Sequence, residues 1–334
     1  MAILRYIIAI MAAYMLTSCY EDFDPGINAE PVLCLNSLIT AGEPIKVDVS
    51  HTWMFDDENS IFNNDVKDAK ITIFANEQVV EQSYLPKKGD RIRIVADSPT
   101  YGMATAEVTV PYPAPIENVK FTPTATKVWI GDKDFYHYEM LAQITFNLNI
   151  EMGIKDFPGI ANYYKFGYGE KRDDLNNNES STNQSLLMGI FNYDSEPIFK
   201  EHISVFETVM GNGDDIEFLF FTDKQFSGKT YTLHINFTDS FFRISSQKYD
   251  ESLLECKIPL YLTTISQSYY NHAVYKWNID NGVLGDMADI GFADPTWGYS
   301  NVSTGAGVVA AQSTACVTID LKEFLKTILN KKPK

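Results

Sequence analysis

Short runs in which hydrophobic and polar residues alternate dominate the chain between residues 31 and 113. Segments 45–49 and 91–96 place an apolar side chain at every second position. Successive side chains of a β-strand point to opposite faces, so this pattern predicts strands with one buried face. Similar runs predict further strands over 32–39, 70–75, 78–82 and 104–110.

Turn-forming residues separate these predicted strands at short intervals. Segments 41–44 and 87–90 each contain glycine, and Asn76-Glu77 leaves only a short link between two strands. Such a link suits a hairpin, although Asn-Glu is weaker turn chemistry than Asn-Gly. Six or seven short strands at this spacing predict a small antiparallel β-sandwich over residues 31–112.

Residues 113–334 form the second predicted domain, and prolines at 111, 113 and 115 mark the boundary because proline opposes strand pairing. Its strand patterns are less regular and lie over 141–150, 163–168, 216–222, 230–237 and 260–264. The chain is therefore predicted to be mainly β. A larger β-rich sandwich or barrel with one or two short helices follows the first sandwich.

The clearest helix signal begins at Ser266, a residue type that suits the N-cap position. Apolar residues recur after it at helical spacing, namely Tyr269, Tyr270, Ala273, Val274 and Trp277. The pattern stops near Asn281-Gly282. Segment 320–329 predicts a short terminal helix or a strand.

A short apolar run opens the chain. Arg5 precedes ten apolar residues from Ile7 to Leu16, a length too short to span about 30 Å of hydrocarbon. Leu16-Thr17-Ser18-Cys19 then resembles a bacterial lipobox, in which the peptide is cut before a cysteine that becomes acylated. We therefore predict a signal peptide over 1–18 and lipidation of Cys19; the alternative is an ordinary signal peptide with a chance cysteine.

Three carboxylates follow this cysteine within the predicted tether, residues 19–30: Glu21, Asp22 and Asp24. An acidic stretch at this position resembles the surface-export signal of Bacteroidota lipoproteins. It also suits a solvated linker, and the two interpretations are compatible. We expect an outer-membrane protein that is anchored by lipid and faces the cell exterior.

Charge limits the classes of partner. The chain has 334 residues and a formal net charge of -17. Such an acidic surface is repelled by phosphate backbones, so nucleic acid is excluded as an expected partner. Cations, neutral sugars and peptides all stay open.

Three cysteines remain after Cys19, and their number is odd. Cys34 and Cys316 lie in apolar or β-branched stretches and are predicted to be buried in strands. One disulfide between Cys256 and Cys316 stays open, because the chain is expected outside the cytoplasm.

No catalytic motif emerges from the sequence. His-Glu-x-x-His, Gly-x-Ser-x-Gly and the phosphate-binding Gly-x-x-x-x-Gly-Lys are absent. Asp174, Asn176 and Asn178 have the first spacings of a calcium loop, but its glycine and bidentate glutamate are missing. His234 alternates within a strand and is predicted to be structural. We therefore predict no enzyme activity, no metal and no cofactor.

Aromatic residues are the better candidates for binding. Trp297 and Tyr299 lie in the Gly-rich stretch 291–307, between the predicted helix and the last strand. Aromatic rings on such a loop can stack on sugars, contact cations or anchor a partner protein. The alternative is that they close the end of the β-domain by packing.

Four segments follow the lipobox, namely 38–47, 66–73, 104–111 and 300–311. Together, in this order and spacing, they resemble the Bacteroidota lipoproteins of domain of unknown function 4249. The resemblance implies an immunoglobulin-like N-terminal domain and a β-rich C-terminal domain. It also implies genes beside TonB-dependent transporters, and it lends no catalytic residues. Ser303-Thr304 stand where the family is usually glycine-rich.

These observations favour a non-catalytic surface lipoprotein that binds a ligand as the accessory of a TonB-dependent transporter in nutrient uptake. An adhesion or interaction protein is the alternative. A surface hydrolase is the third candidate, because acidic residues are plentiful although the sequence places no pair of them together. The sequence does not identify the ligand.

Overall fold

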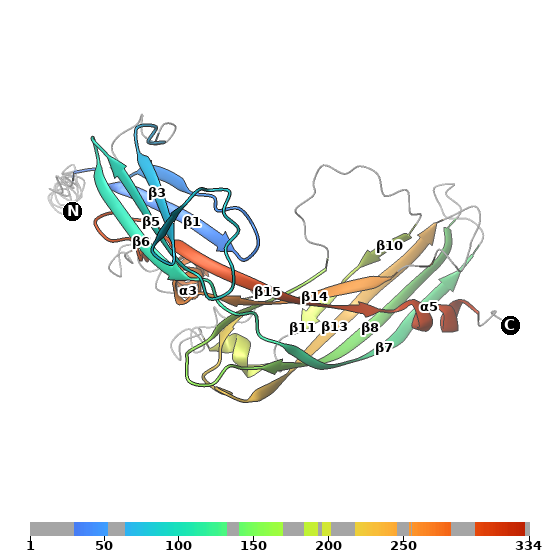
Figure 1. Cartoon of the computed structure of the whole chain (residues 1–334). Helices are drawn as coiled ribbons and strands as arrows, with labels where there is room; N and C mark the ends of the chain where they lie inside the picture. The colour runs from blue at the N-terminus through green and yellow to red at the C-terminus, as the bar shows by residue number, and fades with distance from the viewer. Residues whose placement is uncertain are drawn as a thin grey trace, which may run out of the picture. The chain divides into compact units, whose positions relative to one another are not determined.

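A computed structural model of the chain describes residues 30–52, 64–131, 140–169, 184–192, 196–201, 218–245, 254, 256–281 and 298–330. These residues form a mainly β structure with three sheets and two α-helices (Figure 1). Contacts divide the chain into two units, Met1–Pro31 and Val32–Lys334, and the three sheets and both α-helices belong to the second. No helix within the described ranges is long and apolar enough to cross a membrane.

The first sandwich consists of two sheets that share one core. Its four-stranded sheet has the order β4-β3-β5-β6 and is antiparallel throughout. The strands are β3 (Lys70–Ala75), β4 (Gln78–Val80), β5 (Arg91–Ser98) and β6 (Gly102–Thr109). The opposite sheet contributes β1 (Leu33–Thr40) and β2 (Asp48–His51). All six strands were predicted, although β2 begins three residues later than expected. The immunoglobulin-like topology stays a prediction.

The antiparallel part of the prediction is wrong at β1. Its second neighbour is β15 (Val309–Asp320), which runs parallel to it from the far end of the chain. Val302, Val309 and Ala311 are buried in the same core as Leu33 and Leu35 of β1. The short-range pattern could not reveal this pairing, because it joins residues separated by most of the sequence.

A second core lies between the larger sheets. The five-stranded sheet has the order β10-β13-β8-β7, with β11 also paired to β13. Its strands are β7 (Ile116–Ile130), β8 (Met140–Lys155), β10 (Gln184–Leu187), β11 (Ile190–Asn192) and β13 (Thr230–Ser245). The six-stranded sheet has the order β12-β9-β14-β15-β1-β2, with β9 (Tyr163–Tyr168), β12 (Phe220–Thr222) and β14 (Lys257–Ile265). Within the described residues, neither strand order closes on itself. Of the two predicted alternatives, the described strands therefore form a sandwich and not a barrel.

The alternation of side chains along the five-stranded sheet fixes which face meets the core. Even-numbered residues of β8 from Ala142 to Met152 are buried, whereas the odd-numbered residues from Gln143 to Glu151 are not. In β13 the buried set changes from odd to even numbers at Thr238–Asp239, where the register shifts and an extra residue forms a β-bulge. The bulge keeps the apolar residues of both halves of β13 on the core.

Two α-helices complete the described structure. Ser266 Oγ accepts a hydrogen bond from Tyr269 N at 3.3 Å and begins α3 (Gln267–Asn281), which confirms the predicted N-cap and helix. The terminal segment forms α5 (Lys322–Leu329), and Leu325 is buried in the second core. A 3₁₀ turn, η2 (Pro197–Lys200), precedes Glu201.

Cys34 and Cys316 lie in strands, β1 and β15, as predicted, but the prediction that they are buried is wrong. Cys34, Cys256 and Cys316 are all free, and Cys316 is exposed while Cys34 is half-buried. Cys316 pairs opposite Tyr261, and Cys256 directly precedes Lys257, the residue opposite Asp320. Five positions along a strand correspond to about 17 Å, which no disulfide spans. Burial, with a smaller contribution from Asp320, raises the pKa of the Cys256 thiol to about 12.

Candidate functional site

Most of the residues predicted to carry function lie outside the described ranges. These are Cys19, Glu21, Asp22, Asp24 and Trp297, and also the loop with Asp174, Asn176 and Asn178. Tyr299 is described and is half-buried. The predictions for the others remain as they were made.

Tyr299 lies among other tyrosines near α3. The rings of Tyr163 and Tyr270 are 5.1 Å apart. Burial raises the pKa of Tyr163, and the nearby Asp223 and Tyr299 raise it further. A carbon placed at the Cβ position of Gly298 would lie 3.7 Å from the Tyr275 hydroxyl. Half-burial beside these rings favours the packing interpretation of Tyr299 over free stacking on a ligand.

The buried carboxylates of the second core have hydrogen-bond partners. Asp156 accepts hydrogen bonds from the Tyr164 hydroxyl and, at 2.7 Å, from Gly228 N. Asp223 accepts one from Asn162 Nδ2 at 3.4 Å. In the described part of the chain, no group of three or more His, Cys, Asp or Glu side chains is placed to hold a metal ion. These carboxylates therefore join turns to strands.

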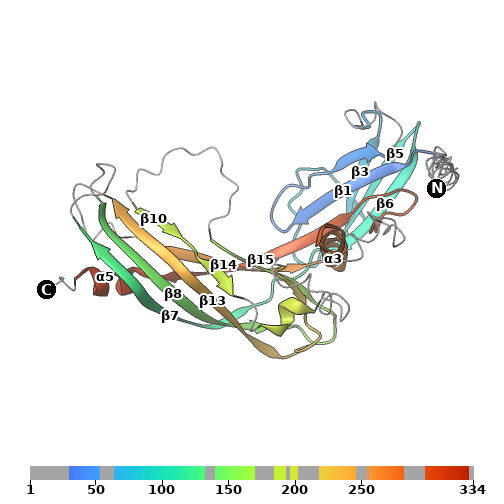
Figure 2. The ribbon, with the colours of Figure 1, turned by 180° about the vertical axis from the view of Figure 1, so that it is seen from behind.

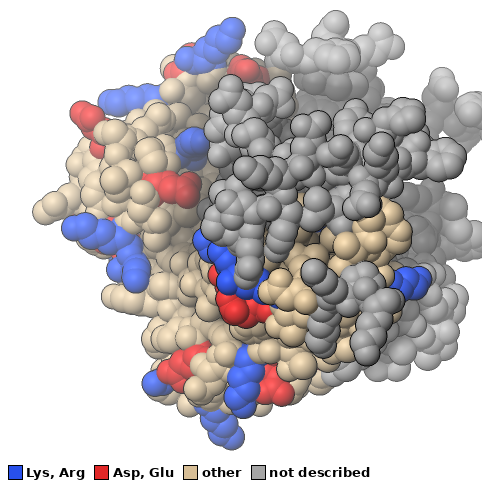
Figure 3. Space-filling model, turned by 90° about the vertical axis from the view of Figure 1, so that its right-hand side faces the viewer, with Lys and Arg blue, Asp and Glu red and all other residues tan. Residues whose placement is uncertain are grey.

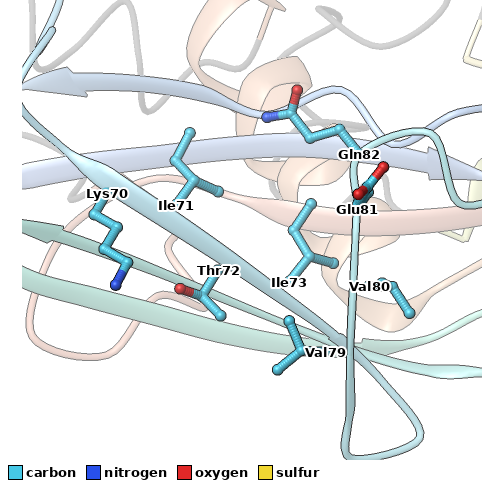
Figure 4. Close-up of a pocket in the computed structure, with 8 residues that line it drawn as sticks. All are labelled: Lys70, Ile71, Thr72, Ile73, Val79, Val80, Glu81 and Gln82. Atoms are coloured by element: carbon cyan, nitrogen blue, oxygen red, sulfur yellow. The ribbon is translucent and has the colours of Figure 1, made fainter.

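A shallow groove of about 600 Å³ lies at the edge formed by β3 and β4. Strand β4 pairs with β3 only at Ile73–Ala75. The chain then leaves this edge, and Gln82 O accepts a hydrogen bond from Ile45 N at 2.9 Å. Figure 4 shows Ile71 and Ile73 on one face of β3, with Lys70 on the other. The groove offers apolar contact, one lysine, one glutamate and the neutral polar side chains of Thr72 and Gln82.

A larger polar surface lies on the five-stranded sheet, which Figure 2 shows with β7, β8 and β13 side by side. We call the side turned away from the second core the outer face. One row between its two ends, which we call the middle row, crosses four strands, because Asn149 pairs opposite both Thr122 and Asn236, and Asn236 pairs opposite Asn192. Directly opposite residues share a face, so three amides lie side by side.

One end of the outer face carries paired charges. Lys120, Glu151 and His234 form a row, and Lys120 Nζ lies 3.7 Å from a Glu151 carboxylate oxygen. His234 is held by Glu196, whose side chain is only 3% exposed. That carboxylate accepts hydrogen bonds from His234 N at 2.6 Å and from the Tyr231 hydroxyl at 2.6 Å, and its Oε1 lies 3.1 Å from His234 Nδ1.

These contacts agree with the prediction that His234 is structural. Burial, followed by the hydrogen bond to Glu196, raises the pKa of Tyr231. No serine, threonine or cysteine of the described ranges forms a hydrogen bond with the His234 ring. Activation of a nucleophile needs such a bond, and the contacts of the described residues show only that Glu196 holds His234 on β13.

The opposite end of the outer face is aromatic and cationic. Gln143 pairs opposite Trp129 and Arg243, and Thr145 pairs opposite Lys127 and Phe241. The Arg243 guanidinium carbon lies 5.8 Å from the centre of the Phe241 ring. Arg243 and Lys127 have no ion-pair partner within the described ranges. On the side of the molecule in Figure 3, lysine or arginine lies close to aspartate or glutamate in several places.

The sequence matches the family described as Domain of unknown function (DUF4249) over residues 20–316. The chain belongs to this family. The match confirms the resemblance drawn from the four sequence segments. The region matched to DUF4249 includes the first core, the outer face, most of the second core and most of β15. The family description assigns no activity, and no curated protein matches the chain.

Sequence reasoning missed the outer face entirely. Trp129, Arg243 and the three asparagines lie in four different strands, and only the strand order brings them together. One signal was present in the sequence, since asparagine is disfavoured in strands and yet recurs at 147 and 149 within a strongly alternating run.

Proposed function

We propose that this DUF4249 protein is a lipid-anchored, non-catalytic binding protein on the outer surface of the outer membrane. It serves a TonB-dependent transporter as an accessory in nutrient uptake. Cys19 behind a short apolar run carries the proposal, because acylation there fixes the site of action. The acidic residues Glu21, Asp22 and Asp24 support export to the surface.

The outer face supports a binding role for the folded part of the chain. It combines amides, hydroxyls, two cations and an exposed indole over neighbouring strands of one sheet. Binding residues on a rigid sheet need no large rearrangement to meet a ligand. The Glu196–His234 pair lacks a nucleophile partner in the described ranges, so a hydrolase is less well supported.

The anchor is tested by metabolic labelling with a palmitate analogue followed by membrane fractionation. We expect the wild-type protein to carry the label and to fractionate with the outer membrane. Cys19→Ser should lose both properties, whereas Cys34→Ser, the matched control, should keep them. A Cys19→Ser protein that still fractionates with the outer membrane contradicts the proposed anchor.

The partner is tested separately by affinity purification from detergent-solubilised membranes. Recovery of an intact TonB-dependent transporter with the tagged protein supports the accessory role. Recovery of a host or neighbouring-cell surface protein without any transporter supports adhesion instead and rejects the transporter as partner.

A further inference from the structure

We propose that the outer face of the five-stranded sheet binds an acidic oligosaccharide that lies across β7, β8 and β13. Trp129 stacks on a sugar ring, the amides of the middle row bind sugar hydroxyls, and Arg243 with Lys127 binds sugar carboxylates. The inference deepens the proposed function by naming its ligand class. It rests on that function only for the cellular location of binding, the outer surface of the outer membrane.

The middle row matches the chemistry of hydroxyl groups. Each asparagine amide offers two donors and one acceptor, and a sugar hydroxyl both donates and accepts. Asn149 and Asn236 lie on interior strands whose backbone groups are already paired on both sides. An extended peptide would therefore find no free backbone edge there, and the recognition has to use side chains.

The indole of Trp129 lies along its own strand, next to the backbone of Gly131. A carbon at the Cβ position of Gly131 would be 2.4 Å from Cζ2 and 2.7 Å from Cη2 of the indole. Only glycine at 131 leaves room for the ring in this position. Trp129 nevertheless remains 43% exposed. An indole held against the backbone with accessible surface offers its apolar π-face to the C–H groups of a sugar ring at little entropic cost.

The two cations, Arg243 and Lys127, indicate that the ligand is negatively charged. The chain carries a net charge of -17, yet Arg243 and Lys127 lie in neighbouring rows without ion-pair partners in the described ranges. Phe241 lies in the same row as Lys127 and next to Arg243. A guanidinium that faces solvent suits a carboxylate, which it can bind with two parallel hydrogen bonds. Nucleic acid would bring dense phosphate charge against a strongly acidic protein.

The dimensions suit a chain rather than a single sugar. From Gln143 to Glu151, β8 advances by eight residues, which corresponds to about 27 Å. The two cations and Trp129 lie at one end of this length, whereas Asn149 lies only two residues from Glu151, which pairs with Lys120 at the other end. Carboxylate binding is thus confined to one end, whereas hydroxyl binding extends along the face.

Isothermal titration of the full-length protein, purified in detergent, tests the inference. The probes are tetragalacturonate and its neutral counterpart galactotetraose. We expect the acidic probe to bind, the neutral probe to bind at least about tenfold more weakly, and added salt to weaken the acidic complex.

Three variants and a matched control locate the site. Trp129→Ala and Arg243→Gln should each weaken tetragalacturonate binding by about tenfold or more. Arg93→Gln should not, although Arg93 also lies over a ring, that of Phe74 at 3.9 Å, on the sheet of the first sandwich. Trp129→Phe keeps a ring in place and should abolish the ligand-induced change in tryptophan fluorescence while the thermal unfolding temperature stays unchanged.

The inference is wrong if neither probe binds at millimolar concentration, if both bind equally, or if Trp129→Ala and Arg243→Gln bind like the wild type. A variant that loses tetragalacturonate binding but still co-purifies with a transporter would separate the ligand site from the accessory role. Binding without any transporter in the purification would reject the accessory role and leave the ligand class standing.

Discussion

Individual buried carboxylates hold turns of this protein in place, and Asp90 is the clearest example. It accepts hydrogen bonds from Lys87 N at 2.7 Å, the Tyr84 hydroxyl at 2.7 Å and Asn76 Nδ2 at 2.8 Å. Burial alone would raise the pKa of this carboxyl. The three hydrogen bonds outweigh burial, so the pKa of Asp90 lies below its usual value of 3.8. The charged form is therefore the stabilising form.

The pH dependence follows from this sign. The pKa of Asp90 is lower in the folded than in the unfolded chain, so its contribution is complete at neutral pH and is lost as the pH falls through the folded-state pKa. Asp90→Asn should cost about 2 kcal/mol of unfolding free energy at neutral pH. Urea unfolding measured from pH 7 downward should show this difference narrow below the usual pKa. Asp97→Asn, at an exposed position on β5, is the control and should change the free energy of unfolding little at neutral pH.

Gly305 is a second residue whose identity the structure explains. A Cβ at this position would lie 2.5 Å from Leu33 O and 2.9 Å from Ala104 Cβ, so the loop packs directly on β1 and β6. Gly305→Ala should destabilise the protein by about 2 kcal/mol, because neither neighbour can move freely. Gly298→Ala, which meets only an ordinary contact at 3.7 Å, should change the unfolding midpoint little. Equal effects of the two changes would show that the loop does not pack as described.

At the scale of elements, the hairpin between β3 and β4 forms against the backbone preference of one of its turn residues, Glu77. Asn76 and Glu77 have φ angles of 50° and 67°, the left-handed region that a two-residue hairpin loop requires. Glycine suits the second position better than glutamate. Glu77 also pairs with Arg91 and, at 3.5 Å, with Arg93, but this exposed pairing contributes little.

Glu77→Gly should therefore be more stable than Glu77→Gln by about 1 kcal/mol, since both lose the carboxylate and only the first relieves the backbone. Thermal unfolding of the two variants beside the wild type measures this difference. A glutamine variant as stable as the glycine variant would mean that the turn carries no strain.

The strand pattern predicted most of the elements because burial on one face imposes a period of two. Prediction failed where that period is interrupted. The extra residue at Thr238–Asp239 reverses the alternation in β13, so the sequence indicated only 230–237 of a strand that continues to Ser245. β7 was missed as a continuous strand because it is an edge with two register shifts and mostly exposed side chains.

The candidate site was harder to predict than the fold for a related reason. Which strands lie next to each other depends on contacts between distant residues. Asn149, Asn236 and Asn192 become one row only in the order β11-β13-β8. The helix at Ser266, by contrast, follows from a cap and a periodicity that are both local.

At the scale of the whole molecule, β15 makes the two cores depend on one strand. Its first residues pair with β1 from Ser37 to Thr40, and its later residues pair with β14. Val309 is buried in the first core and Ile319 in the second. The loop before it also joins both sheets of the first sandwich, since Ser303 pairs with Thr105 of β6 and Leu35 N donates to Ala306 O at 2.8 Å.

This arrangement predicts that residues 31–112 do not fold alone, although the sequence pattern marks them as a domain. Without β15, the backbone of β1 loses its parallel partner and the core loses Val302, Val309 and Ala311. An isolated small sandwich has little stability to lose. We expect the 31–112 fragment to lack a cooperative thermal transition by circular dichroism and to bind a hydrophobic dye.

Fusing residues 298–314 to the end of that fragment through a flexible linker should restore a cooperative transition. The linker adds only the modest entropy of closing a longer loop, whereas the returning segment restores a strand pairing and three buried side chains. A fused segment carrying Ala311→Asp is the control and should fail, because it places a charge in the core. Cooperative folding of the unfused fragment would instead show that β15 joins a sandwich that is already complete, and the two cores would then unfold independently.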